Sequence, residues 1–477
     1  ILAPHVRYDR ESFIARASNH DDPYEEVAHE VEAEVASVIK DQRLPGVNLY
    51  RERWRFYPGG SLAAQSLGFV AYGEDGISRS GRYGLERYYD DVLQRDSKDV
   101  YVNFFAELFS NISDSLFAED SERSGNIVTT IEPSVQLHLE SVLASTSAQW
   151  GAKRTGGIIM NPQTGAVYAL GIDPTFDTNN FEKVEDSTLF KNPLVENVYE
   201  MGSIIKPITM AIGLDTGAIV PESTYYDAGS IRLDGFTIRN YDGGARGEVA
   251  MQEILNQSLN TGVSHIVNLV GTDVFSEYMT GFGIREETGI DLPNEARGLT
   301  DNLDSPRMVE YATASFGQGI AITPIATVRA LAALGNGGRL VTPHLVHEIE
   351  YDSGGAVEVK FPEEERVITT ETSEEITRML VAVVDDALRG GTVAKEHYSI
   401  AAKTGTAQIA QTGARGYYDD RFMHTFFGYF PAYDPEYLIF LYTIEPKGAR
   451  YASETLTTPF MNIVDFLINY YQVPPDR

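Results

Sequence analysis

The sequence contains no cysteine and only two tryptophans in 477 residues. Without cysteine the chain can form no disulfide, no thiolate nucleophile and no cysteine-ligated zinc site. It also lacks any run of 18 or more apolar residues, so no segment has the pattern of a transmembrane helix. Neither an initiator methionine nor a signal-peptide pattern opens the chain, which starts ILAPHVRYDRESF. We therefore expect a fragment whose natural N-terminus is missing.

Basic residues are scarce: 38 lysines and arginines stand against 69 acidic residues, giving a formal charge of −31. Binding to phosphate groups requires clustered Lys and Arg, so this balance disfavours nucleic acid and anionic membrane surfaces as direct partners. The Gly-x-Ser-x-Gly elbow of α/β-hydrolases is absent as well. His344 and His347 do not have the zinc-protease spacing, and we predict neither a metal site nor a cofactor.

The apolar fraction of 43% predicts a globular protein. The length of 477 residues predicts more than one domain. Helical, acidic periodicity runs through YEEVAHEVEAEVASVIKDQ and ends near Pro45-Gly46, and an Arg- and Tyr-rich segment follows. Ser121 to Asn126 is polar and rich in turn residues, as linkers are. The expected division is a domain of residues 1–125 and a second domain of residues 126–477.

The second domain has strand patterns at both of its ends and a long helical middle. The segment IVTTIEPSVQLHLESVLAST predicts a strand and then a helix, and GGIIMNPQTGAVYALG predicts a hairpin around Asn161 to Gly165. Near the C-terminus, AAKTGTAQIA, MHTFFGYFPAY and EYLIFLYTIEP are three further strand patterns. A Pro/Asp turn joins the last two, which predicts antiparallel neighbours. This order of elements indicates an α+β fold.

A serine and a lysine stand close together in the apolar segment EMGSIIKPITM, at Ser203 and Lys206. Residues i and i+3 of a helix project from the same face. Pro207 is tolerated only near a helix start, so we predict that the pair lies at a helix N-terminus, where backbone N–H groups favour developing negative charge. The flanking isoleucines would desolvate the Lys206 amine and lower its pKa, which makes it available as a base for a serine nucleophile.

Two further segments supply partners for this pair. In NQSLNTG, Ser258 and Asn260 are two apart and would not share a helix face, so we expect them in a turn that faces a cleft. In AAKTGTAQIA, Lys403 to Thr406 lie on a predicted strand, and the glycine at 405 indicates close approach of another backbone or a ligand. The two-residue period of a strand leaves open whether Lys403 or Thr404 faces the cleft.

The combination Ser203-x-x-Lys206, Ser258-x-Asn260 and Lys403-Thr-Gly, in this order, resembles the penicillin-recognising serine enzymes. Within that superfamily the chain resembles a class B penicillin-binding protein over nearly its whole length, on segments such as RFYPGGSLAAQSLGFV, GRYGLERYYDDVL and SFGQGIAITPIATVRALAALGNGGRLVTPHLV. Two features differ from related patterns. Met201 replaces the usual proline before Gly-Ser, and class A β-lactamases carry an Asp where this chain has Leu259.

The deacylation motif of class A β-lactamases is also missing, because Glu295 is followed four residues later by Leu299 instead of Asn. The resemblance therefore implies a peptidoglycan D,D-transpeptidase and not a dedicated β-lactamase. The implied fold is an antiparallel sheet flanked by helices, with an all-helical subdomain and an N-terminal pedestal that resembles a dimerisation domain.

The resemblance also implies a role for each catalytic residue. Ser203 would attack the penultimate D-Ala of a stem peptide, and Lys206 would accept the serine proton. Ser258 would relay a proton to the leaving amine, held by both lysines. Asn260 would hydrogen-bond Lys206 and the substrate amide, and Lys403 would attract the substrate carboxylate.

For the strand, the resemblance implies that Thr404 and Thr406 donate their hydroxyls to that carboxylate, with Gly405 between them in the substrate-binding segment. The backbone N–H groups of Ser203 and Thr406 would form the oxyanion hole. As an extended segment, residues 403–409 could also pair with a peptide by β-augmentation.

Two alternatives stay open: a hydrolytic D,D-carboxypeptidase and a non-catalytic β-lactam sensor or scaffold. The implied ligands are stem peptides and β-lactams, and the pedestal would contact a membrane glycosyltransferase. A lost N-terminal anchor would hold the protein at the extracytoplasmic face of the bacterial cytoplasmic membrane. Neither the organism nor a role in division or elongation can be inferred from the residues.

Overall fold

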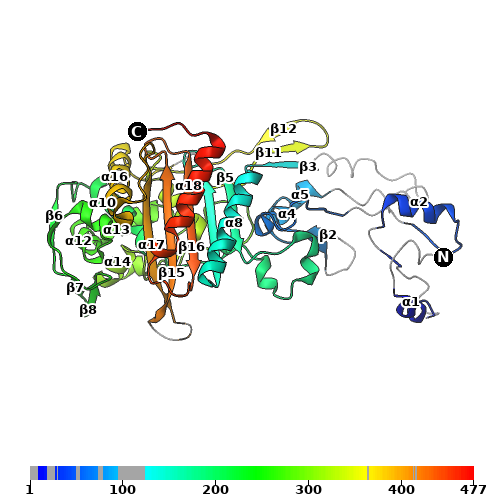
Figure 1. Cartoon of the computed structure of the whole chain (residues 1–477), viewed down its shortest axis with the longest axis horizontal. Helices are drawn as coiled ribbons and strands as arrows, with labels where there is room; N and C mark the ends of the chain where they lie inside the picture. The colour runs from blue at the N-terminus through cyan, green and yellow to red at the C-terminus, as the bar shows by residue number, and fades with distance from the viewer. Residues whose placement is uncertain are drawn as a thin grey trace.

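The computed structural model describes residues 9–18, 27–28, 31–49, 54–73, 79–94, 124–362, 365–411, 413 and 416–477. Figure 1 shows an elongated molecule, with the elements α1 (Arg10–Ala17) and α2 (Ala33–Asp41) at one end and the larger α+β region at the other. Among these described residues no helix combines the length and the apolarity that crossing a bilayer requires.

A five-stranded antiparallel sheet forms the centre of the larger region. Its spatial order is β14 (Ala401–Ala410), β15 (Tyr417–Phe430), β16 (Tyr437–Ile444), β4 (Arg154–Met160) and β5 (Val167–Asp173). The predicted β4–β5 hairpin is confirmed, as is the antiparallel pairing of β15 with β16. In the turn between β4 and β5, the Asn161 side chain accepts hydrogen bonds from Gln163 N and Thr164 N. Strand β14 lies at an edge of the sheet.

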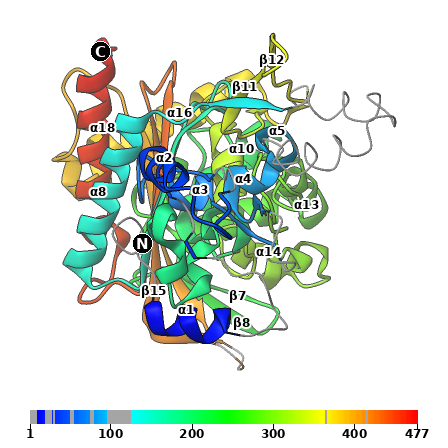
Figure 2. The same ribbon diagram turned by 90° about the vertical axis from the view of Figure 1, so that its right-hand side faces the viewer.

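Helices cover both faces of this sheet, as Figure 2 shows. On one face lie α8 (Pro133–Trp150) and α18 (Thr457–Tyr471), which pack on each other and on the sheet through buried residues such as Leu139 and Phe460. Because β15 and β16 are covered on both sides, their buried parts are nearly continuous apolar runs instead of alternating ones. The second half of β15, from Met423 on, is accordingly buried at every position.

A helical subdomain covers the opposite face. It contains α10 (Lys206–Asp215), α11 (Met251–Asn256), α12 (Asn260–Val270), α13 (Thr272–Gly281), α14 (Met308–Ala314), α15 (Pro324–Ala332) and α16 (Thr370–Ala382). Two small antiparallel pairs lie among these helices: β6 (Thr224–Asp227) with β9 (Gly247–Ala250), and β7 (Ser230–Leu233) with β8 (Phe236–Arg239). The α+β architecture predicted from the sequence is confirmed.

The segment predicted as a linker is partly a strand. Residues 121–123 lie outside the described residues, but Gly125 and Asn126 begin β3 (Gly125–Thr129). Strand β3 pairs with β11 (Val346–Tyr351), which also pairs with β12 (Ala356–Glu358). The polar composition of Ser121–Asn126 concealed this pairing, because strand β3 finds its partner more than 200 residues away. The exact boundary between residues 125 and 126 remains a prediction.

The described residues between 54 and 94 contact the larger region directly. Their elements are α3 (Ala64–Leu67), β1 (Val70–Tyr72), β2 (Arg79–Gly81), α4 (Gly84–Tyr88) and α5 (Asp90–Leu93). Ala63 N donates to the Glu140 carboxylate at 2.7 Å, and the Tyr89 hydroxyl donates to Asp291 at 3.1 Å. The ring of Phe69 stacks on Phe181 at 4.2 Å between centroids.

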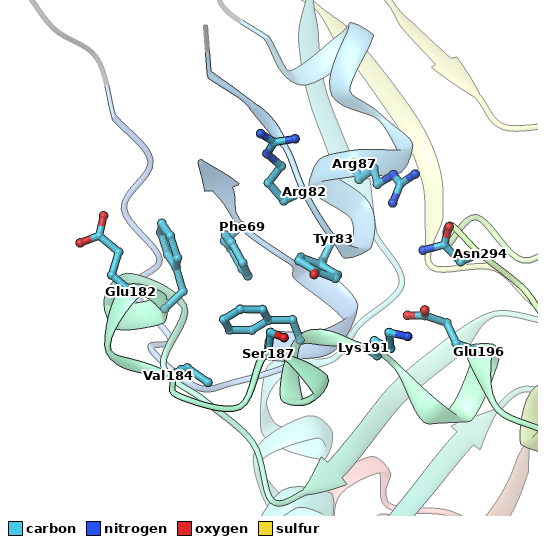
Figure 3. A pocket seen from close by; sticks show the side chains of 12 residues that line it. Phe69, Arg82, Tyr83, Arg87, Glu182, Val184, Ser187, Lys191, Glu196 and Asn294 are labelled. Carbon is cyan, nitrogen blue, oxygen red and sulfur yellow. The ribbon is translucent and has the colours of Figure 1, made fainter. Parts of the chain in front are cut away.

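A groove of about 900 Å³ lies at this junction. Figure 3 shows Phe69 and Tyr83 from the N-terminal part facing Val184 and Ser187 from the segment after β5. The two parts of the chain are therefore packed against one another through aromatic rings as well as hydrogen bonds.

The two histidines of PHLVHEIEY fall where the sequence predicts a strand. His347 lies in β11 and His344 precedes it, and the His344 ring stacks on Phe361 at 4.0 Å. The Nδ1 atom of His344 lies 2.9 Å from the Thr342 carbonyl oxygen. His344 is thus engaged in packing and in a backbone hydrogen bond.

Candidate active site

The first predicted pair lies at the start of a helix, as the sequence indicates. Ser203 belongs to a short 3₁₀ helix, η3 (Gly202–Ile205), and Lys206 is the first residue of α10. Pro207 occupies the first turn of α10, where its missing N–H removes no helical hydrogen bond. The segment therefore forms a tight turn that carries Ser203, followed by a helix that carries Lys206.

Glycines allow η3 to lie directly against the edge strand β14. Gly202 has a φ of +65°, and a Cβ there would come within 3.1 Å of the Thr406 backbone. A Cβ on Gly405 would lie 2.9 Å from Met201 O and 3.0 Å from Ile204 N. The close backbone approach predicted for Gly405 is confirmed. It brings Ser203 next to β14.

Residues outside the three motifs fix the segment before Ser203. Thr425, on β15, donates its hydroxyl to Met201 O at 2.9 Å, and Gly202 N donates to Gly317 O at 3.1 Å. Neither Thr425 nor Gly317 was predicted to have this role. Gly317 lies in the segment SFGQGIA, but a glycine in a sequence does not indicate which backbone it will contact. Nothing in the sequence around Thr425 indicates its contact with Met201.

Ser258 lies between the two lysines. Lys206 Nζ donates to Ser258 O at 2.5 Å and is 3.1 Å from Ser258 Oγ. Lys403 Nζ is 3.3 Å from the same Oγ and 2.9 Å from Thr404 O. The structure therefore joins the three motifs, whose lysines are almost 200 residues apart in the chain, at one hydroxyl. It also places Lys403, and not Thr404, toward the Ser258 side of β14.

Burial depresses the basicity of both amines. The Lys206 side chain has no exposed surface, and burial, followed by repulsion from Lys403, holds its pKa well below the ordinary lysine value. Burial lowers the pKa of Lys403 to about 8. Neither amine has a carboxylate partner among the described residues. This environment favours a neutral Lys206, which is the form that accepts a proton.

Ser258 and Asn260 occupy the turn predicted for them, between α11 and α12. Ser258 adopts a left-handed φ of +55°, and Asn260 is the first residue of α12. The Asn260 amide nitrogen donates to Arg239 O at 2.9 Å. The expected hydrogen bond between Asn260 and Lys206 is not among those formed by the described residues. The Asn260 side chain instead ties the start of α12 to the end of β8.

The two threonines of the third motif are partly exposed on β14. The Thr406 hydroxyl accepts a hydrogen bond from Ala452 N at 3.1 Å, at the start of α17 (Ala452–Thr455). Its own hydrogen is left available for a ligand. Among the strands of the described residues, none pairs with the outer side of this segment, because β14 ends the sheet.

The Glu295 carboxylate hydrogen-bonds backbone N–H groups of a nearby turn. Its carboxylate accepts hydrogen bonds from Thr288 N at 2.7 Å and Gly289 N at 3.1 Å. Leu299 forms a backbone bridge with Ala321. Glu295 thus fixes a turn, in agreement with the absence of the β-lactamase pattern from the sequence.

Comparison with known proteins agrees with this geometry. The profile of the penicillin-binding protein transpeptidase domain matches residues 155–464, and that of the penicillin-binding protein dimerisation domain matches residues 2–128. The first profile alone covers well over half of the chain. The protein therefore belongs to the penicillin-binding transpeptidases and, with its dimerisation domain, to the class B penicillin-binding proteins.

Relatives of known name cover most of this chain. Stage V sporulation protein D of Bacillus subtilis is 31% identical over 90% of this chain and 66% of its own length. Penicillin-binding protein PbpB of Mycobacterium tuberculosis is 27% identical over 97% of this chain and 68% of its length. Peptidoglycan D,D-transpeptidase FtsI of Escherichia coli is 25% identical over 94% of this chain and 73% of its own length. The chain thus spans about two thirds of the length of these relatives.

Solved structures show the same fold. The crystal structure of apo penicillin-binding protein 3 from Mycobacterium tuberculosis superposes with a TM-score of 0.76 at 26% identity, covering 89% of this chain and 92% of that one. The same protein has been crystallised with aztreonam and with ampicillin, and both complexes give a TM-score of 0.76. The predicted transpeptidase fold with an N-terminal pedestal is confirmed.

Proposed function

We propose that this chain cross-links peptidoglycan stem peptides through an acyl-enzyme on Ser203. The observation that carries the proposal is the position of Ser258 Oγ, 3.1 Å from one buried amine and 3.3 Å from another, beside the turn that holds Ser203. A nucleophilic hydroxyl, a poised base and a second hydroxyl that can pass a proton are the minimal parts for acyl transfer.

In the acylation step Ser203 Oγ bonds to the carbonyl carbon of the penultimate D-Ala, and its proton moves to neutral Lys206. The carbon–nitrogen bond to the terminal D-Ala then breaks, and Ser258 passes a proton to the departing amine. Because Ser258 contacts both lysines, its hydroxyl can be reprotonated by either one. The product is a serine ester and free D-Ala.

In the second step the amine of another stem peptide attacks the ester. A new amide bond forms, the ester bond to Ser203 Oγ breaks, and the proton returns from the amine through Ser258 to the serine oxygen. The backbone N–H groups of Ser203 and Thr406 are our candidates for the oxyanion hole, because Gly202 packs directly on the Thr406 backbone.

The substrate's terminal carboxylate is assigned to the third motif. Thr404 and Thr406 would donate their hydroxyls to it, and Lys403, when protonated, would add a positive field. Gly405 contributes by letting β14 approach Ser203. Asn260 is assigned to the substrate amide, because its amide oxygen and second N–H are not used in the hydrogen bond to Arg239 O.

β-Lactams, which complex the related penicillin-binding protein 3, would acylate Ser203 in the same way and remain attached. As relatives named for the cell wall imply, the protein would act in the bacterial envelope. We further assign it to the extracytoplasmic face of the membrane, with an N-terminal anchor and a membrane glycosyltransferase as the partner of residues 1–125. Residues 126–477 would carry the catalysis.

A two-substrate assay tests the proposal. The protein is incubated with a thioester analogue of a D-Ala-terminated stem peptide and with a second stem peptide that has a free amine. A transpeptidase yields the cross-linked amide, and Ser203→Ala abolishes it. Hydrolysed donor without cross-linked product would indicate a carboxypeptidase instead, and no turnover of donor would indicate a sensor.

A further inference from the structure

The turn that carries Ser258 and Asn260 depends on hydrogen bonds from other parts of the chain. Ser258 is in the left-handed region at φ +55°, which non-glycine residues seldom adopt. Helix α12 then starts at Asn260, and its N-cap residue is Leu259, whose side chain accepts no hydrogen bond. The first backbone N–H groups of α12 therefore need an acceptor from another part of the chain.

Asn240, which directly follows β8, supplies that acceptor. Its amide oxygen accepts from Thr261 N at 3.3 Å, and it lies 3.1 Å from Thr261 Oγ1. Both residues are buried, with 3% and 5% of their surface exposed. The helix that begins with Asn260 is thus capped by the side chain of Asn240, which lies 20 residues earlier in the sequence.

Asp227, the last residue of β6, orients this cap. Its fully buried carboxylate accepts from Asn240 Nδ2 with both oxygens, at 3.1 and 3.0 Å. Because a carboxylate only accepts, it requires the amide nitrogen of Asn240 on its own side, which turns the amide oxygen toward Thr261. Asp227 also accepts from Thr261 Oγ1 directly, at 2.8 Å.

A second branch of the same network reaches the residue before Ser258. Asp227 accepts from Arg246 N at 3.2 Å, and the Arg246 guanidinium donates to Gln257 Oε1 at 3.0 Å. The ion pair of Arg246 with Asp242, at 2.7 Å, fixes the guanidinium. Asp227 is therefore connected to both sides of the Ser258–Asn260 turn, through Gln257 before it and Thr261 after it.

We propose that Asp227 is a positioning residue for the acyl transfer. It contacts neither lysine nor the nucleophile, and it acts by holding Ser258 Oγ between the two amines. The proposal rests on the function proposed above. The sequence gives no motif for it, because Asp227 stands 31 residues before Ser258 and belongs to a different element.

The test is Asp227→Asn, which keeps the size of the side chain and replaces one acceptor oxygen by a donor facing other donors. A misplacement of catalytic groups by about 1 Å costs on the order of 10²-fold in rate. We expect the second-order rate constant for acylation by penicillin to fall by about 10- to 100-fold, while the variant stays folded.

Asp291→Asn is the matched control. Asp291 is also a buried carboxylate, 4% exposed, and it accepts from Leu345 N at 2.7 Å and Val346 N at 2.8 Å, away from the three motifs. We expect this variant to lose thermal stability to a similar degree but to be acylated at a rate within about twofold of the unmodified protein. General destabilisation alone would slow both variants equally.

A double-mutant cycle separates positioning from any other effect. In a Ser258→Ala background, Asp227→Asn should add less than about twofold, because the hydroxyl that it positions is gone. The proposal would be overturned if the rate losses of the two single variants multiplied in the double variant. It would also be overturned if a folded Asp227→Asn variant were acylated at the wild-type rate. If that variant does not fold, Gln257→Ala interrupts the second branch at a partly exposed residue, and it should lower the rate of acylation in the same direction.

The proposed function fails separately. If Ser258→Ala itself is acylated at the wild-type rate, the role of Ser258 is wrong whatever Asp227 does. If Ser258→Ala is slow and both Asp227→Asn and Gln257→Ala are fast, only the positioning role is wrong.

Discussion

In the function proposed above, the pKa values of Lys206 and Lys403 set the pH range of the reaction. Lys206 acts as a base only when neutral, and its pKa lies well below the ordinary value because of burial and the nearby Lys403. Lys403 attracts a carboxylate only when protonated, and burial lowers its pKa to about 8. The same low-dielectric environment therefore prepares one amine for proton transfer and limits the other as a binding group.

We predict a bell-shaped dependence of the acylation rate on pH. The rate rises as Lys206 loses its proton and falls near pH 8 as Lys403 loses its own. In Lys403→Arg the guanidinium stays charged at every accessible pH, so the alkaline decline should disappear even if the maximal rate is lower. Penicillin acylation measured from pH 5 to 10 tests this. An unchanged decline near pH 8 in the variant would assign it to another group.

The sequence predicted that the three motifs would meet, because acyl transfer needs these groups together, and the structure brings Lys206, Ser258 and Lys403 into contact. The expected hydrogen bond between Asn260 and Lys206 is not formed among the described residues, and the Asn260 amide nitrogen donates to the carbonyl of Arg239. Asp227 and Thr425 were not predicted either. Their roles depend on which backbone atoms the fold brings beside them, and a single sequence does not contain that information.

Contact between η3 and β14 determines where the nucleophile lies. Gly405 has backbone atoms of Met201 and Ile204 within 3.0 Å of the position of a Cβ. Real Cβ atoms do not come so close to backbone, so any side chain at residue 405 must push β14 and η3 apart. Gly405 is thus needed for packing, apart from the binding role that we propose for the third motif.

Gly405→Ala should slow acylation by penicillin on the order of 10²-fold, because the shift separates Ser203 from β14. Overpacking should also lower the free energy of unfolding by about 1–3 kcal/mol. Gly281→Ala is the control: its Cβ would meet only a Val367 methyl group, at 4.0 Å. Rates from time-resolved mass spectrometry should be near normal for the control. Equal rates for the two variants would contradict this account.

His424 joins β15 to α17, the helix whose Ala452 N binds Thr406. Its Nδ1 lies 2.9 Å from Thr455 Oγ1 and its Nε2 lies 3.2 Å from Arg450 O. Burial lowers the pKa of His424 to about 4, from an ordinary value of 6.5. The unfolded chain therefore takes up the proton first as pH falls, and stability is lost between about pH 6.5 and 4.

His424→Gln should remove this part of the pH dependence. The difference in free energy of unfolding between the two proteins should change by up to about 3 kcal/mol between pH 7 and 4. Urea unfolding at pH 7, 5 and 4 measures it, and the subtraction cancels the titration of the many carboxylates. Parallel curves for the two proteins would show that His424 is protonated equally in the folded and unfolded states.

Strands and helices of the larger region were predictable because they are long and strongly apolar or periodic. The hairpin around Asn161 and the β15–β16 pair are of this kind. Strand β3 was missed in part, since its first residues, Gly125 and Asn126, look like a turn and find their partner in β11. Pairing between strands so far apart in sequence leaves no local pattern.

At the scale of the whole molecule, the described residues between 54 and 94 are packed against the larger region. Tyr89 reaches from the N-terminal part to Asp291, a residue that also binds two backbone N–H groups at the start of β11. The aromatic contacts of Phe69 lie beside this point.

Tyr89→Phe should lower the free energy of unfolding by about 1 kcal/mol, because one buried hydrogen bond to a carboxylate is lost. The acylation rate should not change, since Asp291 keeps its two backbone donors. Urea unfolding and penicillin acylation on the same preparation check both statements. A large fall in acylation rate would mean that the junction controls the active site more directly than its contacts indicate.

Domain organisation was the least predictable feature. Composition separates residues 1–125 from the remainder, yet the contacts that fix one part on the other come from single residues such as Ala63 and Tyr89. Nothing in their sequence neighbourhood predicts a partner that is 77 or 202 residues away.

The measurement that bears most directly on the central claim is intact-mass spectrometry after incubation with penicillin, followed by peptide mapping. We predict one covalent adduct per chain, located on Ser203, and none on Ser203→Ala under the same conditions. An adduct of equal yield on the Ser203→Ala variant, or mapping of the adduct to another residue, would show that a different nucleophile does the chemistry.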